Sequence, residues 1–169
     1  TLVTLDNVKV TDNRVTGMND TDLGGGIYLF DSSLSMSDSI ISINQAAHAG
    51  GLYFDNDYDG PTVTIKKSAI INNRANDGNG GGIYVGENGR LSLENVTIAE
   101  NQADGEGTDT GMGGGLFMNA NLAANLNHVT IADNWASYYG DAVAGEYLVH
   151  LNAYNSIFYY QYANDVCYY

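Results

Sequence analysis

Residues 94–103 read ENVTIAENQA, and this ten-residue phrase decides the fold because the chain repeats its pattern six times. Each copy has an aliphatic stretch, then a polar anchor, then a small residue two places later. The anchors recur at intervals of 31, 29, 28, 33 and 27 residues, so the copies differ mainly in loop length. Repetition on this scale is typical of a solenoid. The anchors are Asn13, Asn44, Asn73, Asn101, Asn134 and Gln161.

Two further phrases accompany each copy. An apolar-polar-apolar triplet such as Leu91-Ser92-Leu93 precedes it, and a phrase such as GGGLFM at 113–118 follows it at a variable distance. Alternating apolar residues with β-branched side chains favour strands over helices, so each turn should hold three short strands. We therefore expect one all-β domain over residues 1–169, a right-handed single-stranded parallel β-helix (a pectate-lyase-like solenoid) of about six coils.

Stacking of the coils in register would place equivalent residues of successive coils next to one another. The predicted inward columns include Val10, Ile41, Ile70, Ile98, Ile131 and Phe158 in the middle strand, and Ile27, Leu52, Ile83, Leu116 and Val143 in the third. The Asn anchors would form a ladder at a bend, with side-chain amides bonding between coils. The ladder would comprise Asn13, Asn44, Asn73, Asn101 and Asn134.

The composition excludes several classes of partner. Twenty acidic residues against six basic ones give a net charge of −14, which argues against nucleic acid and against anionic membrane surfaces. No apolar run approaches the roughly 20 residues of a membrane span. Cys167 is the single cysteine, so an internal disulfide is excluded.

The repeat phrases carry a family resemblance. The succession NVTIAENQA, GGGLFM and a final NSIFYYQYANDVC resembles the β-helix repeats of bacterial surface proteins in the CSLREA and choice-of-anchor group. The Gly-Gly-aliphatic and Asn-anchor phrases also resemble repeats of polymorphic outer-membrane autotransporter adhesins. The resemblance implies an extracellular or cell-surface location and a structural or adhesive role. It supplies no catalytic motif, because this fold hosts many functions.

An acidic loop is the strongest candidate for a metal site. Asp55, Asp57 and Asp59 alternate in the segment DNDYDG at 55–60, a spacing that lets carboxylates converge on Ca²⁺. A complete EF-hand is excluded because its final Glu position is Lys66. The alternatives are a calcium clip and an acidic turn in solvent.

A carboxylate pair is the candidate for catalysis. Glu100 and Asp133 each precede an anchor, so stacking would bring their backbones to about 4.8 Å. Two such carboxylates could hydrolyse a glycoside, or they could form an exposed acidic ladder. The second interpretation is favoured, because no column of Lys or Arg accompanies the pair.

An aromatic column is the candidate for binding. Tyr28, Tyr53, Tyr84 and Phe117 each follow the inward residue of the third strand, so they should stack along the outer face. Such a stripe could bind sugar rings or a protein of a host surface, or it could be a ladder that only shields the sheet.

The terminal coils are the candidates for self-association. Bare strand edges are templates for pairing, so the chain is either part of a longer solenoid or meets another copy head to tail. We expect a non-enzymatic extracellular protein that self-associates through its ends into a filament, with a glycan-binding or glycan-degrading module as the alternative. Tyrosines near the last coil would supply the contacts: Tyr159, Tyr160, Tyr162, Tyr168 and Tyr169.

Overall fold

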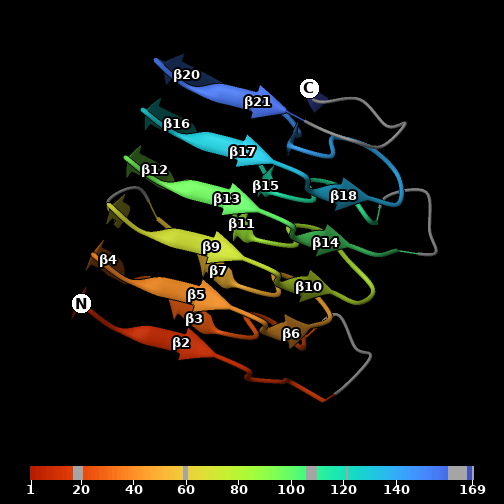
Figure 1. The fold of residues 1–169 in the computed structure, drawn as a ribbon, viewed down its shortest axis with the longest axis horizontal. Helices are drawn as coiled ribbons and strands as arrows, with labels where there is room; N and C mark the ends of the chain where they lie inside the picture. Colours follow the sequence, from red (N-terminus) through yellow and green to blue (C-terminus); the bar gives the residue numbers. More distant parts are fainter. Residues whose placement is uncertain (17–20, 59–60, 106–109, 121, 160–166, 169) are drawn as a thin grey trace.

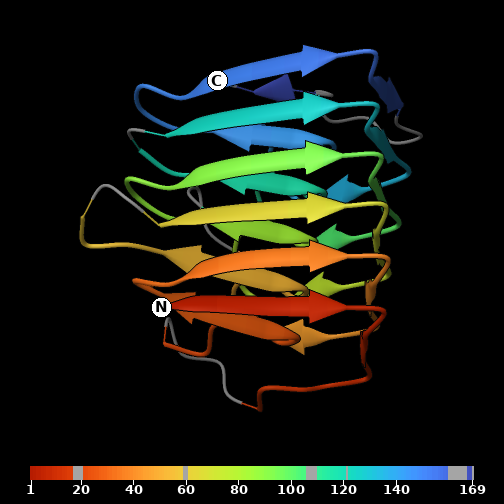
Figure 2. The same cartoon turned by 90° about the vertical axis from the view of Figure 1, so that its left-hand side faces the viewer.

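The computed structural model of the chain is a parallel β-solenoid, as the repeats predict. Its strands stack in chain order from one end to the other, so the two termini lie at opposite ends of the stack (Figures 1 and 2). The described residues form strands, turns and bends, and none of them forms a helix that could cross a membrane. The described ranges are 1–16, 21–58, 61–105, 110–120, 122–159 and 167–168.

The first two sheets contain six strands each, which correspond to about five complete turns. The first sheet holds β1 (Leu2–Asp6), β4 (Ser33–Ser37), β8 (Thr62–Lys66), β12 (Arg90–Glu94), β16 (Ala123–Asn127) and β20 (His150–Tyr154). The second sheet holds β2 (Lys9–Thr11), β5 (Ile40–Ser42), β9 (Ala69–Ile71), β13 (Thr97–Ala99), β17 (Thr130–Ala132) and β21 (Ile157–Tyr159).

The third sheet is built from the strands that follow the glycine phrases. It holds β3 (Ile27–Phe30), β7 (Leu52–Asp55), β11 (Ile83–Val85), β15 (Leu116–Met118), β19 (Val143–Gly145) and β22 (Cys167–Tyr168). A short fourth sheet of two-residue strands, which the repeat pattern did not predict, follows the Asn anchors. Its strands are β6 (Gln45–Ala46), β10 (Arg74–Ala75), β14 (Gln102–Ala103) and β18 (Trp135–Ala136).

The observed register confirms the predicted columns. Ile41 pairs with Val10 on one side and with Ile70 on the other, and Leu52 likewise lies between Ile27 and Ile83. The central members of these columns are fully buried in one core cluster that runs the length of the solenoid. Because every turn contributes the same apolar positions, no turn buries its own core without its neighbours.

The Asn ladder is also confirmed, and its geometry repeats from turn to turn. The Asn73 side-chain amide donates to Oδ1 of Asn101 at 3.0 Å, and the Asn73 backbone N–H donates to the same oxygen at 3.0 Å. The amide makes a second bond, to the Ile41 carbonyl of the preceding turn, at 3.1 Å. Each inner anchor therefore holds together the turns on either side of it.

Two corners of each turn place non-glycine residues at positive φ. Position 100 precedes the anchor Asn101 and has φ 56°, while position 95 lies between the first two sheets and has φ 55°. The corner before the anchors contains Asp12, Ile43, Asn72, Glu100 and Asp133. Since an isoleucine occupies this corner in one turn, the left-handed conformation is imposed by the stacked turns around it rather than by its own residue.

Candidate functional site

The terminal turns leave the core columns open. At the N-terminal turn, Val3, Leu5 and Val10 pack against the core but remain partly exposed, and the edge strand β1 pairs with β4 alone. At the other end, Leu151 and Phe158 occupy the same columns and are also only partly buried. Both ends therefore present an apolar surface that another turn could cover.

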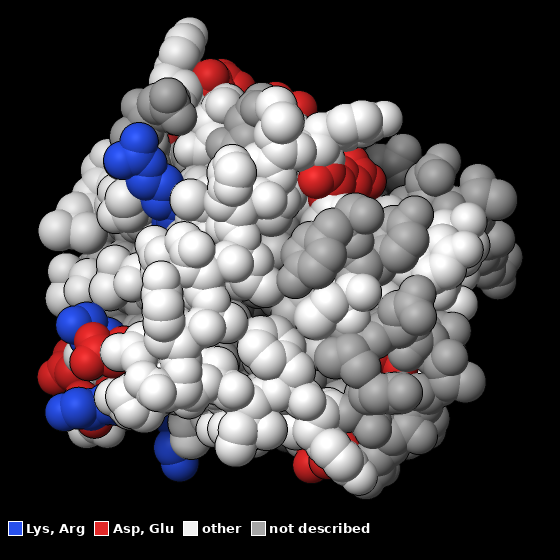
Figure 3. All heavy atoms as spheres, turned by 90° about the horizontal axis from the view of Figure 1, so that it is seen from above, with Lys and Arg blue, Asp and Glu red and all other residues white. Residues whose placement is uncertain are grey.

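Charge is scarce at these two ends. Residues 1–16 contain two Asp and two basic residues, and residues 150–159 contain no Asp, Glu, Lys or Arg. Figure 3 looks on to the C-terminal end, and in the described part of this view most Lys, Arg, Asp and Glu side chains lie toward the outline. The net charge of −14 is thus carried mostly by the turns between the ends.

The aromatic column forms the predicted stack. The rings of Tyr53 and Tyr84 lie 4.7 Å apart at 14°, Tyr28 stacks on Tyr53 at 5.5 Å, and Phe117 lies 4.9 Å from Tyr84. The column is not an open stripe, however. Tyr53 is 8% exposed and Phe117 only 1%, whereas Tyr28 at the end is 50% exposed. The hidden end of the stack belongs to a second apolar cluster outside the third sheet, which includes Met112, Ala144, Tyr138 and Tyr139.

Polar groups surround the phenol hydroxyls. Burial, and then nearby charges that include Asp55, raise the pKa of Tyr84 to about 12. The pKa of Tyr53 is raised further by the same two causes and by its hydrogen bond to Asp55. Asn119 hydrogen-bonds the Tyr84 hydroxyl, and the carboxylates of Glu146 and Glu87 act on it from a longer range. Both phenols therefore stay protonated in a negative electrostatic field.

A groove of about 390 Å³ opens beside this stack. It is lined by Leu23, His48, Tyr53, Tyr84 and Thr110. The His48 ring lies edge to face with Tyr84, with 6.3 Å between centroids, and its Nδ1 accepts from the Asn79 N–H at 3.4 Å. The ring also covers Gly78, where a Cβ would meet Nδ1 at 2.1 Å. The aromatic column predicted tyrosines here, whereas Leu23, His48 and Thr110 come from loops that the repeat pattern does not align.

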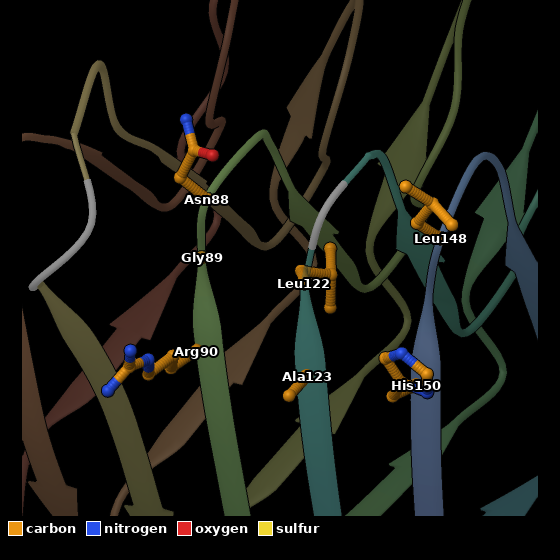
Figure 4. A pocket seen from close by; sticks show the side chains of 7 residues that line it. All are labelled: Asn88, Gly89, Arg90, Leu122, Ala123, Leu148 and His150. Carbon is orange, nitrogen blue, oxygen red and sulfur yellow. The ribbon is translucent and has the colours of Figure 1, made fainter.

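A second, shallow groove of about 380 Å³ lies at the start of three strands of the first sheet. Figure 4 shows Ala123 between Arg90 and His150, with the Arg90 side chain directed away from Ala123 and the side chains of Leu122 and Leu148 above. Asn88 and Gly89 complete the described lining, in which there is no carboxylate. This groove was not predicted, because its lining residues combine loop positions with the outward side of the strands.

The acidic loop has two of its three aspartates in the described part of the chain. Asp55 accepts from the Asn56 N–H at 2.9 Å, and the Asp57 N–H donates to the Asp31 carboxylate at 3.0 Å. Asp59 lies outside the described residues. Within the described ranges no three His, Cys, Asp or Glu side chains are placed to hold a metal ion. The calcium site stays a prediction.

The carboxylate pair lies at a corner on neighbouring turns. The Glu100 N–H donates to the Ala132 carbonyl at 3.2 Å, so the residue preceding Asp133 is directly beside Glu100. Glu100 is exposed, and one carboxylate oxygen of Asp133 is buried without a hydrogen-bond partner. The same corner holds Ile43 and Asn72 in earlier turns, so a carboxylate is not needed for the turn itself.

Of the C-terminal tyrosines, Tyr159 is placed at the predicted end, on β21, with 55% of its surface exposed. Tyr168 belongs to β22, whose backbone pairs with β19. Tyr160, Tyr162 and Tyr169 lie outside the described residues, as does the last anchor, Gln161. Tyr147 and Tyr154 are further exposed tyrosines near this end, at 81% and 62%.

Comparisons with known proteins give no relative for this chain. No family model, no curated protein and no solved structure matches it.

Proposed function

We propose that this chain is a non-enzymatic structural or adhesive β-solenoid of a cell surface or extracellular setting, and that it stacks end to end on further copies. One observation carries the proposal: both ends leave the core columns open, and the outermost strands, in residues 1–16 and 150–159, carry no net charge. Val3 and Leu5 at one end match Leu151 and Ala153 at the other, because they belong to the same columns of the first sheet.

Axial stacking is favoured over side-by-side contact by the distribution of charge. The turns between the ends, residues 31–149, hold 15 of the 20 acidic residues against 4 of the 6 basic ones, so the sides of two solenoids repel each other. The ends of two solenoids do not repel each other in this way, and their unpaired strand edges supply hydrogen-bonding groups with a fixed direction. A contact between unlike ends does not close on itself, so a filament is the expected product. The resemblance to bacterial surface repeats supports the proposed location.

Cysteine cross-linking tests the stacking directly. In head-to-tail stacking, Thr4 of one copy continues the column that ends at Asn152 of the next copy. With Cys167→Ser as background, a mixture of Thr4→Cys and Asn152→Cys proteins should form a disulfide-linked dimer under oxidation. Asn125 lies one strand further from the junction, so Asn125→Cys is the matched control. Its Cα would lie roughly 9.6 Å from Thr4, beyond the reach of a disulfide.

Sedimentation supplies the independent measurement. Assembly should increase with protein concentration, and also with salt as the net charge is screened. Leu5→Lys should abolish assembly because it places a charge on the core column of the end, whereas Thr4→Lys on the outward side of β1 should weaken it less. A monomer at high protein concentration, with no cross-link between Thr4→Cys and Asn152→Cys, would contradict the proposal.

A further inference from the structure

We propose that the groove beside the tyrosine stack binds a neutral saccharide unit, and we define this saccharide groove by Leu23, His48, Tyr53, Tyr84 and Thr110. The proposal is independent of end-to-end stacking, because the groove lies on the side of the solenoid, against the outer face of the third sheet. Its volume of about 390 Å³ is within the range of small-ligand sites.

The lining has the chemistry that a hydroxyl-rich ligand needs. Two phenols, an imidazole and a threonine hydroxyl are hydrogen-bonding groups, and Leu23 adds an apolar wall. Among the lining residues that the structure describes there is no carboxylate and no Lys or Arg. The phenol rings are held in place before a ligand arrives, because Tyr53 and Tyr84 stack on each other and also contact Tyr28 and Phe117. Such fixed groups lower the entropic cost of binding.

The stacking of the rings excludes a different class of ligand. A cation would bind over the open face of a tyrosine ring. Here Tyr53 has its two faces covered, by Tyr28 on one side and by Tyr84 on the other, and Tyr84 lies in turn between Tyr53 and Phe117. Tyr53 and Tyr84 therefore offer the groove their ring edges and hydroxyls, and their covered faces exclude a cation–π contact.

The surrounding charge selects neutral over acidic sugars. Asp55, Glu87 and Glu146 all act electrostatically on Tyr84, and all are acidic. A carboxylate on the ligand would be repelled by this field, which adds to the repulsion from the net charge of −14. The groove should accordingly bind a neutral hexose or pentose unit more tightly than a uronate unit of the same shape.

Calorimetric titration with defined probes tests the proposal. The neutral probes are the tetrasaccharides of β-linked glucose, mannose, xylose and galactose, and the acidic probe is tetragalacturonate. At least one neutral probe should bind saturably, and more tightly than the acidic one. Tyr84→Phe keeps the ring and removes the hydroxyl, so it should weaken binding roughly 2- to 10-fold, the loss of one hydrogen bond. Leu23→Trp should block the groove and abolish binding.

The matched control is Tyr147→Phe, which removes a hydroxyl from a tyrosine that is 81% exposed and does not line the groove. The affinity of the Tyr147→Phe protein for a neutral probe should equal that of the wild type. Tyr53→Phe serves as the second variant if Tyr84→Phe lowers the melting temperature. The proposal is overturned if no neutral probe binds, if the acidic probe binds more tightly, or if Leu23→Trp and the folded phenylalanine variant bind like the wild type.

Discussion

Asn73 donates its side-chain amide to the Oδ1 atom of Asn101 at 3.0 Å, although 28 residues separate them in the chain. The same oxygen accepts the backbone N–H of Asn73, and Asn101 repeats both bonds to Asn134. Asn73 and Asn101 are each 1% exposed, so water cannot replace these bonds. The ladder thus joins successive turns through buried hydrogen bonds at this corner.

We expect Asn73→Ala to lower the free energy of unfolding by about 1–3 kcal/mol, because it leaves buried backbone groups unsatisfied. Denaturant unfolding measures the change. Asn125→Ala is the matched control: Asn125 is exposed and its bond to Asn152 lies in solvent, so the change should stay within about 0.5 kcal/mol. Equal effects of the two substitutions would contradict a stabilising role of the Asn ladder.

Gly82→Ala should lower the free energy of unfolding of the solenoid by about 1–3 kcal/mol or more, since this range is the usual cost of overpacking. A Cβ at Gly82 would lie 2.6 Å from the Gly115 carbonyl and 3.0 Å from Nδ2 of Asn101, so the neighbouring turn would have to move. Gly86→Ala is the control, because its nearest obstacles are carboxylate atoms of Asp55, and only the Asp55 Cβ at 2.9 Å stays in place when that side chain rotates. Thermal unfolding of both variants checks the prediction, and a milder effect at Gly82 than at Gly86 would refute it.

Alkaline pH should destabilise the protein partly through Tyr84. Burial raises its pKa from 10.0 to about 12, so the folded state holds the proton more tightly than the unfolded state. The resulting stability is complete below pH 10.0 and is lost as the pH rises toward about 12. Unfolding in urea across this interval should show a shallower loss for Tyr84→Phe than for the wild type. Parallel slopes for the two proteins would exclude this contribution.

Calcium should raise the melting temperature if Asp55, Asp57 and Asp59 form the predicted clip. Binding to the folded state alone stabilises it by about 2.7 kcal/mol at a concentration 100 times the dissociation constant. Chelation should reverse the shift, and Asp57→Asn should reduce it. Asp77→Asn, which changes an exposed aspartate outside this loop, should not. Identical midpoints with calcium and with chelator would identify the segment as an acidic turn.

The repeat pattern by itself determined the solenoid, its three long sheets and the Asn ladder. It could do so because parallel stacking in register places identical positions of each copy side by side, as with Val10, Ile41 and Ile70. It also predicted that Tyr53 and Tyr84 stack, since both occupy one column of the third sheet. These relationships depend only on the order of residues within a turn.

Only the tertiary structure decided which of these positions are accessible. Tyr28 and Phe117 belong to one column, yet their exposed fractions are 50% and 1%, because Phe117 packs with Met112 and Ala144 in a second apolar cluster. The saccharide groove likewise depends on Leu23 and His48, which the parallel bridge between them brings together on neighbouring turns. Loops of unequal length follow no period, so the surfaces that they cover or leave open are fixed by packing in three dimensions.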